Sequence, residues 1–285
     1  MNGNLNLKQA LAEGAGRLEG ASTTPRRDAE LLLMRVLGYD RAFLLTHPDA
    51  TLTAEQSATY ENWLRRRAAH EPIQYILGEQ EFFGLTFAVT PDVLVPRPET
   101  EHLVEAILER VAHNLPLRIA DVGTGSGAIA VALAVKLPQA QITALDISEA
   151  ALTVACRNAQ AHHTAERIRF LLSDLLAAVA GETFDAIVSN PPYVAEADRD
   201  SLEPQVRDYE PDAALFAGPS GLDVYKKLIP QAFDRLKPGG WLLLEMGQGQ
   251  RDAIARLLAG WNNVGFIHDL QGIPRVACAQ RPGLH

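Results

Sequence analysis

From Leu117 onward, short apolar runs alternate with helical segments, and this alternation restricts the possible folds more than any other feature. The runs read L-R-I-A-D-V-G (117–123), Q-I-T-A-L-D (141–146), I-R-F-L-L-S-D (168–174), F-D-A-I-V-S-N (184–190) and G-W-L-L-L-E-M-G (240–247). Helical segments between them begin after Gly125, at Ser148 and around Leu222. Strands separated by helices pair in parallel. The pattern therefore predicts an α/β fold with a doubly wound, mostly parallel sheet.

The N-terminal part of the chain has a different periodicity. Apolar residues between Leu5 and about Ala69 recur with helical spacing, most clearly over Pro25–Leu37, and Thr53 with Gln56 resembles a capping box. Residues 76–95 then change to a strand pattern that turns around Gly84. We expect a helical bundle over 1–75, a β-hairpin linker over 76–96 and the α/β domain over 97–285.

Composition and charge argue against several classes of protein. The net charge is −9, whereas a protein that grips duplex DNA usually presents a basic surface. The one dense basic run, Arg65-Arg66-Arg67, is best interpreted as a solvated helix face. Cys156 and Cys278 have no metal-ligand spacing around them, which indicates a reducing compartment and predicts no metal site. With no signal peptide and no apolar run long enough to cross a membrane, we expect a cytoplasmic protein.

Three of the predicted strands end in residues suited to a nucleoside. The first is followed by Gly123, Thr124, Gly125, Ser126 and Gly127, whose glycines permit a tight turn and close approach of a ligand. The second ends in Asp146, which can accept both ribose hydroxyls. The third ends in Asp174-Leu175, where an acceptor beside an apolar side chain suits an adenine edge. Ligands bind at the carboxyl ends of such strands, and no phosphate-binding G-x-x-x-x-G-K-[ST] loop is present. The combination points to S-adenosylmethionine as the cofactor.

The fourth strand runs into Asn190, Pro191, Pro192 and Tyr193. As an isolated tetrapeptide, N-P-P-Y would be a turn. At the end of this strand, the Asn190 side-chain carbonyl and the Pro191 carbonyl can accept both N–H groups of a planar nitrogen. Pro192 would rigidify the loop, and Tyr193 can stack on a flat group. The motif predicts methyl transfer to an amide or an exocyclic base amine.

Taken together, these motifs resemble those of the release-factor glutamine methyltransferase family (HemK/PrmC) over nearly the full chain. The resemblance includes P-R-R-D-A-E-L-L-L (25–33), E-P-I-Q-Y-I-L-G (71–78), L-V-P-R-P-E-T-E (94–101), D-V-G-T-G-S-G (121–127), I-V-S-N-P-P-Y (187–193) and G-G-W-L-L-L-E (239–245). It implies a seven-stranded, Rossmann-like S-adenosylmethionine domain preceded by a substrate-recognising helical bundle. It also implies N5-methylation of the glutamine in the Gly-Gly-Gln motif of class 1 peptide release factors.

The resemblance assigns roles to individual residues. It implies that Gly123 to Gly127, Asp146, Leu175 and Asn190 contact the cofactor, and that Asn190 to Tyr193 hold the glutamine amide. Arg97, Pro98 and Thr100 are expected to close over the cofactor, although helix capping is their simpler role. Asp174 is added from the strand-end argument alone.

Three other functions remain open on the sequence. A ribosomal-protein glutamine methyltransferase shares the chemistry and much of the motif set. A DNA adenine methyltransferase also uses N-P-P-Y, on a flipped base, but the acidic balance and the lack of a recognisable target-recognition domain count against it. A non-catalytic binding module is disfavoured by the intact cofactor loop beside N-P-P-Y. We expect a monomer that acts on a protein and makes no direct contact with nucleic acid.

Overall fold

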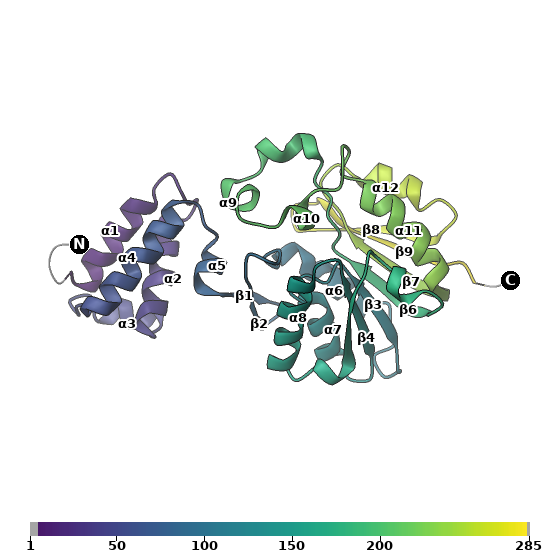
Figure 1. The fold of residues 1–285 in the computed structure, drawn as a ribbon, viewed down its shortest axis with the longest axis horizontal. Helices are drawn as coiled ribbons and strands as arrows, with labels where there is room; N and C mark the ends of the chain where they lie inside the picture. Colours follow the sequence, from purple (N-terminus) through teal and green to yellow (C-terminus); the bar gives the residue numbers. More distant parts are fainter. Residues whose placement is uncertain (1–4, 284–285) are drawn as a thin grey trace. The chain divides into compact units, whose positions relative to one another are not determined.

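The computed structural model describes residues 5–283, which divide into two compact units (Figure 1). One unit extends to Gly78 and includes the later segment Glu203–Tyr209; the other comprises Glu79–Leu202 and the chain from Glu210 onward. The boundaries expected from the sequence, 1–75, 76–96 and 97–285, remain a prediction.

The first unit is helical. Its helices are α1 (Leu7–Leu18), α2 (Pro25–Leu37), α3 (Arg41–Thr46), α4 (Ala54–Ala68), α5 (Ile73–Leu77) and the short α9 (Pro204–Arg207). Asn6 and Thr53 close capping boxes at the starts of α1 and α4, and Gly38, with φ of 71°, ends α2. Tyr60 lies fully buried at the centre of the helical core.

One expectation about this unit is wrong: Arg67 does not lie on a solvated helix face. It is buried and donates from Nε to Oδ2 of Asp28 at 2.7 Å, while Ser22 and Thr24 also donate to the Asp28 carboxylate. Arg65 donates to Asn62, and Arg66 donates to the carboxylate of Glu71. Sequence spacing could not show this, because the partner of Arg67 lies on another helix.

The second unit begins with a hairpin and contains a seven-stranded sheet. In the hairpin, β1 (Glu79–Phe82) pairs antiparallel with β2 (Leu85–Ala88) around Gly84, as the sequence predicts. The sheet has the order β5-β4-β3-β6-β7-β9-β8. Its strands are β3 (Arg118–Val122), β4 (Gln141–Asp146), β5 (Ile168–Leu172), β6 (Phe184–Ser189), β7 (Leu236–Glu245), β8 (Asn262–His268) and β9 (Pro274–Gln280). The first five pair in parallel, and β9 joins β7 and β8 antiparallel.

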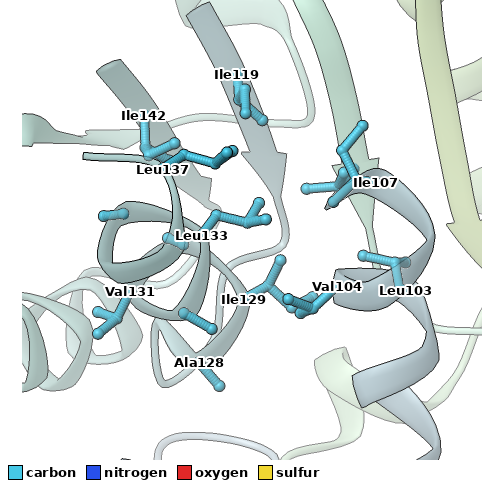
Figure 2. Packing of buried hydrophobic residues seen from close by; sticks show 14 of the residues in the cluster. Leu103, Val104, Ile107, Ile119, Ala128, Ile129, Val131, Leu133, Leu137 and Ile142 are labelled. Carbon is cyan, nitrogen blue, oxygen red and sulfur yellow. The ribbon is translucent and has the colours of Figure 1, made fainter. Parts of the chain in front are cut away.

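Helices cover both faces of this sheet. On one face pack α6 (Glu101–Leu108), α7 (Ala128–Lys136) and α8 (Glu149–Ala161); on the other pack α11 (Asp223–Arg235) and α12 (Arg251–Leu257). Successive strand residues alternate between the two cores, so that Ile119 joins the first and Ala120 the second. Figure 2 shows side chains of α6 and α7 meeting Ile119 and Ile142 of the sheet. The remaining short elements are α10 (Asp212–Leu215) and the 3₁₀ turns η1 (Pro98–Thr100), η2 (Ala165–Arg167), η3 (Ala177–Val179) and η4 (Glu196–Ser201).

The structure confirms the expected fold class and adds what the sequence pattern missed. β7 begins at Leu236 rather than at residue 240, so the strand includes Pro238, Gly239 and Gly240. Its pairing with β6 shifts register between Phe184 and Ala186, beside this segment. The sequence pattern did not locate β8 and β9, which form an antiparallel hairpin at the sheet edge without the helical spacer that marks the others. No helix within residues 5–283 is long and apolar enough to cross a membrane.

Candidate functional site

A cavity of about 340 Å³ opens at the carboxyl ends of the central parallel strands. The loops after β3, β4, β5 and β6 all contribute to its wall, as expected for a sheet whose strand order reverses between β3 and β6. The residues from these loops are Gly123, Thr124, Gly125, Ser126, Asp146, Ile147, Ser148, Ser173, Asp174, Leu175, Asn190 and Pro192. The four strand ends that the sequence singled out therefore meet at one place.

The glycine-rich loop after β3 forms the floor of this cavity. Gly123, Gly125 and Gly127 have φ values of 72°, 53° and 80°, in the left-handed region that favours glycine. Gly127 lies outside the lining set; a Cβ there would lie 3.0 Å from the Cβ of Ala155, so this glycine lets α7 and α8 approach closely. Backbone bonds from Gly123 and Thr124 to the Leu145 carbonyl tie the loop to β4.

Asp146 organises the edge where β4 ends. Its Oδ2 accepts from the backbone N–H of Gly125 at 2.9 Å, and its Oδ1 accepts from that of Ser148 at 3.0 Å. A carboxylate has about four lone-pair sites, so both oxygens can accept further hydrogen bonds from a ligand. The Ser148 hydroxyl caps α8 by accepting from the backbone N–H of Ala151.

The loop after β5 turns sharply at Leu175. This residue has φ of 52°, which is rare for a side chain of this size and typical of functional loops. The Ser173 hydroxyl stabilises the turn by donating to the Leu175 carbonyl and accepting from the backbone N–H of Ala178. Asp174 is exposed and forms part of the cavity wall beside Leu175.

Asn190 and Pro192 are the two residues of N-P-P-Y that line the cavity. Asn190 donates from Nδ2 to the Thr100 hydroxyl at 3.1 Å, which leaves its carbonyl oxygen for other partners. Pro191 and Tyr193 are not among the described residues that line the cavity. Pro191 is buried, and Tyr193 packs half-buried against the second core, where burial raises the pKa of its hydroxyl above the usual range. The substrate contacts expected of Pro191 and Tyr193 remain predictions.

Arg97 and Thr100 line the cavity as expected, whereas Pro98 is outside the described lining set. Arg97 forms an ion pair of 2.5 Å with the buried carboxylate of Glu210. Burial raises the pKa of Glu210, and the charge of Arg97 opposes that rise.

Two stretches of the wall were missed by sequence reasoning. They are Asp92, Val93, Leu94 and Pro96 before η1, and Pro211, Ala213, Ala214, Phe216 and Val224 after the N-P-P-Y loop. Neither stretch follows a strand of the predicted parallel sheet, which was the signal used to find the others. The repeated prolines in L-V-P-R-P and the E-P-D-A-A-L-F segment mark irregular backbone but carry no chemical signature.

Two acids beside the site are fully buried. Burial raises the pKa of Asp121 to about 7, although a hydrogen bond of 2.6 Å from the Thr124 hydroxyl lowers it. Burial likewise raises the pKa of Glu245, the last residue of β7, to about 7. Each has one carboxyl oxygen without a hydrogen-bond partner in the described structure. Neither acid belongs to the described cavity wall, although Asp121 accepts from the hydroxyl of Thr124, which does.

Two protein-family models match parts of the chain. Residues 9–78 match the PrmC N-terminal domain, and residues 99–204 match the methyltransferase small domain. Solved structures share the fold. A methyltransferase from Pyrococcus furiosus covers 81% of this chain over all of its own length, with a TM-score of 0.52 and 20% identity. The T. thermophilus 16S rRNA N2 G1207 methyltransferase, solved with AdoMet and guanosine, covers 71% of this chain over 49% of its own, with a TM-score of 0.54 and 21% identity.

Curated relatives match nearly end to end. The release factor glutamine methyltransferase of Koribacter versatilis is 47% identical over 98% of this chain and 99% of its own length. That of Geobacter sulfurreducens is 44% identical over 88% of each chain, and that of Coxiella burnetii is 43% identical over 97% of this chain and 99% of its own. This chain belongs to the release factor glutamine methyltransferase family.

Proposed function

We propose that this protein transfers a methyl group from S-adenosyl-L-methionine to N5 of the glutamine in the Gly-Gly-Gln motif of class 1 peptide release factors. One observation carries the proposal: Asn190 of N-P-P-Y lines the same cavity as the glycine-rich loop and Asp146. The shared name of the relatives supports the choice of a release factor as substrate.

The residues of the cavity fit the cofactor. Its volume of about 340 Å³ lies within the range of small-molecule sites, and the left-handed glycines leave the floor without side chains where a ligand must approach. The cofactor would be held by Gly123 to Ser126, Asp146, Asp174, Leu175 and Asn190, with Gly127 supporting the loop where α7 and α8 approach closely. Asp146 would accept the ribose hydroxyls, and Asp174 the exocyclic amine of adenine. When bound, S-adenosyl-L-methionine supplies an electrophilic methyl group on a sulfonium.

The protein's own groups would activate the substrate amide by accepting its hydrogens. The nitrogen of an amide is a poor nucleophile because its lone pair is delocalised. Acceptance of both N–H groups, by Oδ1 of Asn190 and the carbonyl of Pro191, favours the charge that develops as the methyl group arrives. Pro192 restricts the loop, and Tyr193 would support the flat amide. Fixed orientation of the two reactants can supply about 7–11 kcal/mol of the barrier reduction. A methylated, protonated amide is acidic enough to lose its proton to water.

The wider assignments follow from the same proposal. The helical unit that matches the PrmC N-terminal domain would recognise the release factor. The protein would work in the cytoplasm as a monomer, and its net charge of −9 supports a protein substrate rather than a nucleic acid.

A parallel methylation assay tests this function. The full chain is incubated with S-adenosyl-L-methionine and, separately, a class 1 release factor, ribosomal proteins and duplex DNA, and mass spectrometry locates the added methyl. We expect methylation of the Gly-Gly-Gln glutamine alone. Methyl on a ribosomal-protein glutamine or on adenine would replace the proposed substrate with the corresponding alternative.

The variant Asn190→Ala tests the mechanism. We expect kcat to fall by about 10²- to 10³-fold, as when one charge-stabilising group is removed, while cofactor affinity changes by less than about threefold. Asn114→Ala, at an exposed position outside the cavity wall, is the matched control and should behave as wild type. Near-normal turnover of Asn190→Ala would refute the role given to the asparagine.

A further inference from the structure

The Asn190 side-chain amide has one end that accepts hydrogen bonds and one end that donates them. The reaction proposed above requires the accepting end to face the substrate. The carbonyl oxygen of the amide accepts hydrogen bonds, whereas its NH₂ group donates them, and the two are nearly the same size. Rotation of the amide by half a turn would present NH₂ to the N–H groups of the substrate and oppose binding. Something in the protein must therefore select the orientation.

Thr100 is the first part of the selecting group. Its hydroxyl accepts from Nδ2 of Asn190 at 3.1 Å, and its side chain is only 4% exposed although it reaches the cavity wall. A hydroxyl has one hydrogen and can also donate. If that hydrogen pointed at Asn190, Thr100 would stabilise the opposite orientation of the amide. The hydrogen must be engaged elsewhere for the observed arrangement to persist.

Glu245 is positioned to engage it. In the parallel pairing of β6 with β7, Ser189 lies opposite Leu244, so Asn190 and Glu245 follow side by side at the carboxyl ends of their strands. Glu245 is only 2% exposed, and hydrogen bonding with Thr100 opposes the rise in its pKa that burial causes. Its Oε2 has no hydrogen-bond partner in the described structure, so the proton that this carboxyl group keeps below about pH 7 can lie on Oε2 while Oε1 accepts. A buried acceptor of this kind draws the Thr100 hydrogen away from Asn190.

We propose that Thr100 and Glu245 are positioning residues that hold the Asn190 amide with NH₂ inward and its carbonyl oxygen toward the substrate amide. The hydrogen bonds run in one direction, from Asn190 to Thr100 and from Thr100 to Glu245. Glu245 is outside the described cavity wall and acts only through Thr100. The inference rests on the proposed function for its catalytic consequence, but the orientation of the amide belongs to the protein alone.

Two substitutions at Thr100 distinguish the role of its hydroxyl from the role of its side-chain packing. Thr100→Val keeps the shape and removes the hydroxyl, whereas Thr100→Ser keeps the hydroxyl. We expect Thr100→Val to lower kcat at least about tenfold, with the affinity for S-adenosylhomocysteine within about threefold of wild type by calorimetry. Thr100→Ser should restore kcat to within about threefold. Equal losses in both variants would show that packing, not the hydroxyl, matters, and would overturn the proposal.

A double-mutant cycle tests the link to Glu245. Glu245→Leu frees the Thr100 hydrogen and should lower kcat about as much as Thr100→Val does; the double variant should lose little more than either single variant. Independent structural damage would give additive losses instead, and additivity would overturn the relay. Should Glu245→Leu fail to fold, the Thr100 pair and the spectroscopic measurement below decide the question.

Nuclear magnetic resonance provides a readout that needs neither cofactor nor substrate. In ¹⁵N–¹H spectra, the side-chain NH₂ of Asn190 should exchange slowly with water in the wild type and in Thr100→Ser, and at least about tenfold faster in Thr100→Val. Fast exchange in the wild type would refute the inward NH₂. A wild type that shows slow exchange but does not methylate a release factor would refute the proposed function while leaving this orientation intact.

Discussion

Gly125 donates its backbone N–H to Oδ2 of Asp146 across 2.9 Å, which joins the floor of the cavity to the end of the neighbouring strand. The same carboxylate accepts from the backbone N–H of Ser148, so one side chain joins the loop after β3 to the start of α8. The edge that would receive a ribose is thus ordered before any ligand binds. Preorganisation of this kind reduces the entropy lost on binding.

Asp146→Asn should therefore weaken cofactor binding more than the loss of one ligand contact would. Because each oxygen of Asp146 accepts from a backbone N–H, the new NH₂ group must face one of these donors in either orientation. We expect the affinity for S-adenosylhomocysteine to fall about 10- to 100-fold, or about 1.4–2.8 kcal/mol, by calorimetry. Asp234→Asn, an exposed acid on α11, is the control. An affinity within about threefold of wild type would contradict the role of Asp146.

Asp174 should determine the preference for adenine. A carboxylate accepts from the exocyclic amine of adenine but repels the carbonyl oxygen that replaces it in hypoxanthine. Wild type should thus bind S-adenosylhomocysteine about 5- to 10-fold more tightly than S-inosylhomocysteine, and Asp174→Ala should lose that preference. Calorimetry with both ligands measures it, with Asp234→Ala as the control. A preference that survives in Asp174→Ala would remove this residue from the site.

Glu245 should make stability fall as pH rises. Burial raises its pKa from 4.5 to about 7, with Glu99 adding to the rise and Thr100, Arg275 and Arg97 opposing it. Between pH 4.5 and 7 the folded protein keeps a proton that the unfolded chain releases, so the free energy of unfolding decreases with pH. The slope from one such group reaches about 1.4 kcal/mol per pH unit. Glu245→Gln cannot titrate, and in denaturant titrations it should gain stability relative to wild type from pH 5 to pH 8. A difference that does not change with pH would contradict the raised pKa.

The Asp28–Arg67 pair should be essential to the helical unit. Both side chains are buried, and the Asp28 carboxylate also accepts from Ser22 and Thr24. Asp28→Ala strands a buried guanidinium and should cost about 3–5 kcal/mol of unfolding free energy, measured by chemical denaturation. The double variant Asp28→Leu, Arg67→Met should recover most of that loss. Arg17→Ala breaks the half-exposed pair with Glu61 and serves as the control, with a cost of at most about 1 kcal/mol. A comparable loss in Arg17→Ala would show that burial is not the cause.

Local pattern was enough to predict the parts of the site that follow directly from a strand. Asp146, Asp174 and Asn190 line one cavity because parallel strands end at the same edge. The partners that hold these residues were beyond local pattern. Glu245 is adjacent to Asn190 only through the β6–β7 pairing, and Arg67 meets Asp28 only through the packing of two helices. Such contacts depend on tertiary register, which the spacing of residues along the chain does not encode.

Gln250 should hold the N-P-P-Y loop in place. The Gly247–Gln250 stretch echoes a Gly-Gly-Gln motif but forms a turn, in which Gln250 Oε1 accepts from the backbone N–H of Gly247. Its Nε2 donates to the carbonyls of Tyr193, at 2.9 Å, and Gly221, at 3.2 Å. Gln250→Glu turns an oxygen toward those two carbonyls and should cost about 1–3 kcal/mol of stability. Because it releases the backbone three residues after Asn190, we also expect kcat to fall at least about fivefold with cofactor affinity nearly unchanged. The neighbouring exposed Gln248→Glu adds the same charge without these contacts and should match wild type in denaturation and turnover. If both variants behave alike, charge rather than the loop contacts accounts for the effect, and Gln250 has no role in positioning the motif.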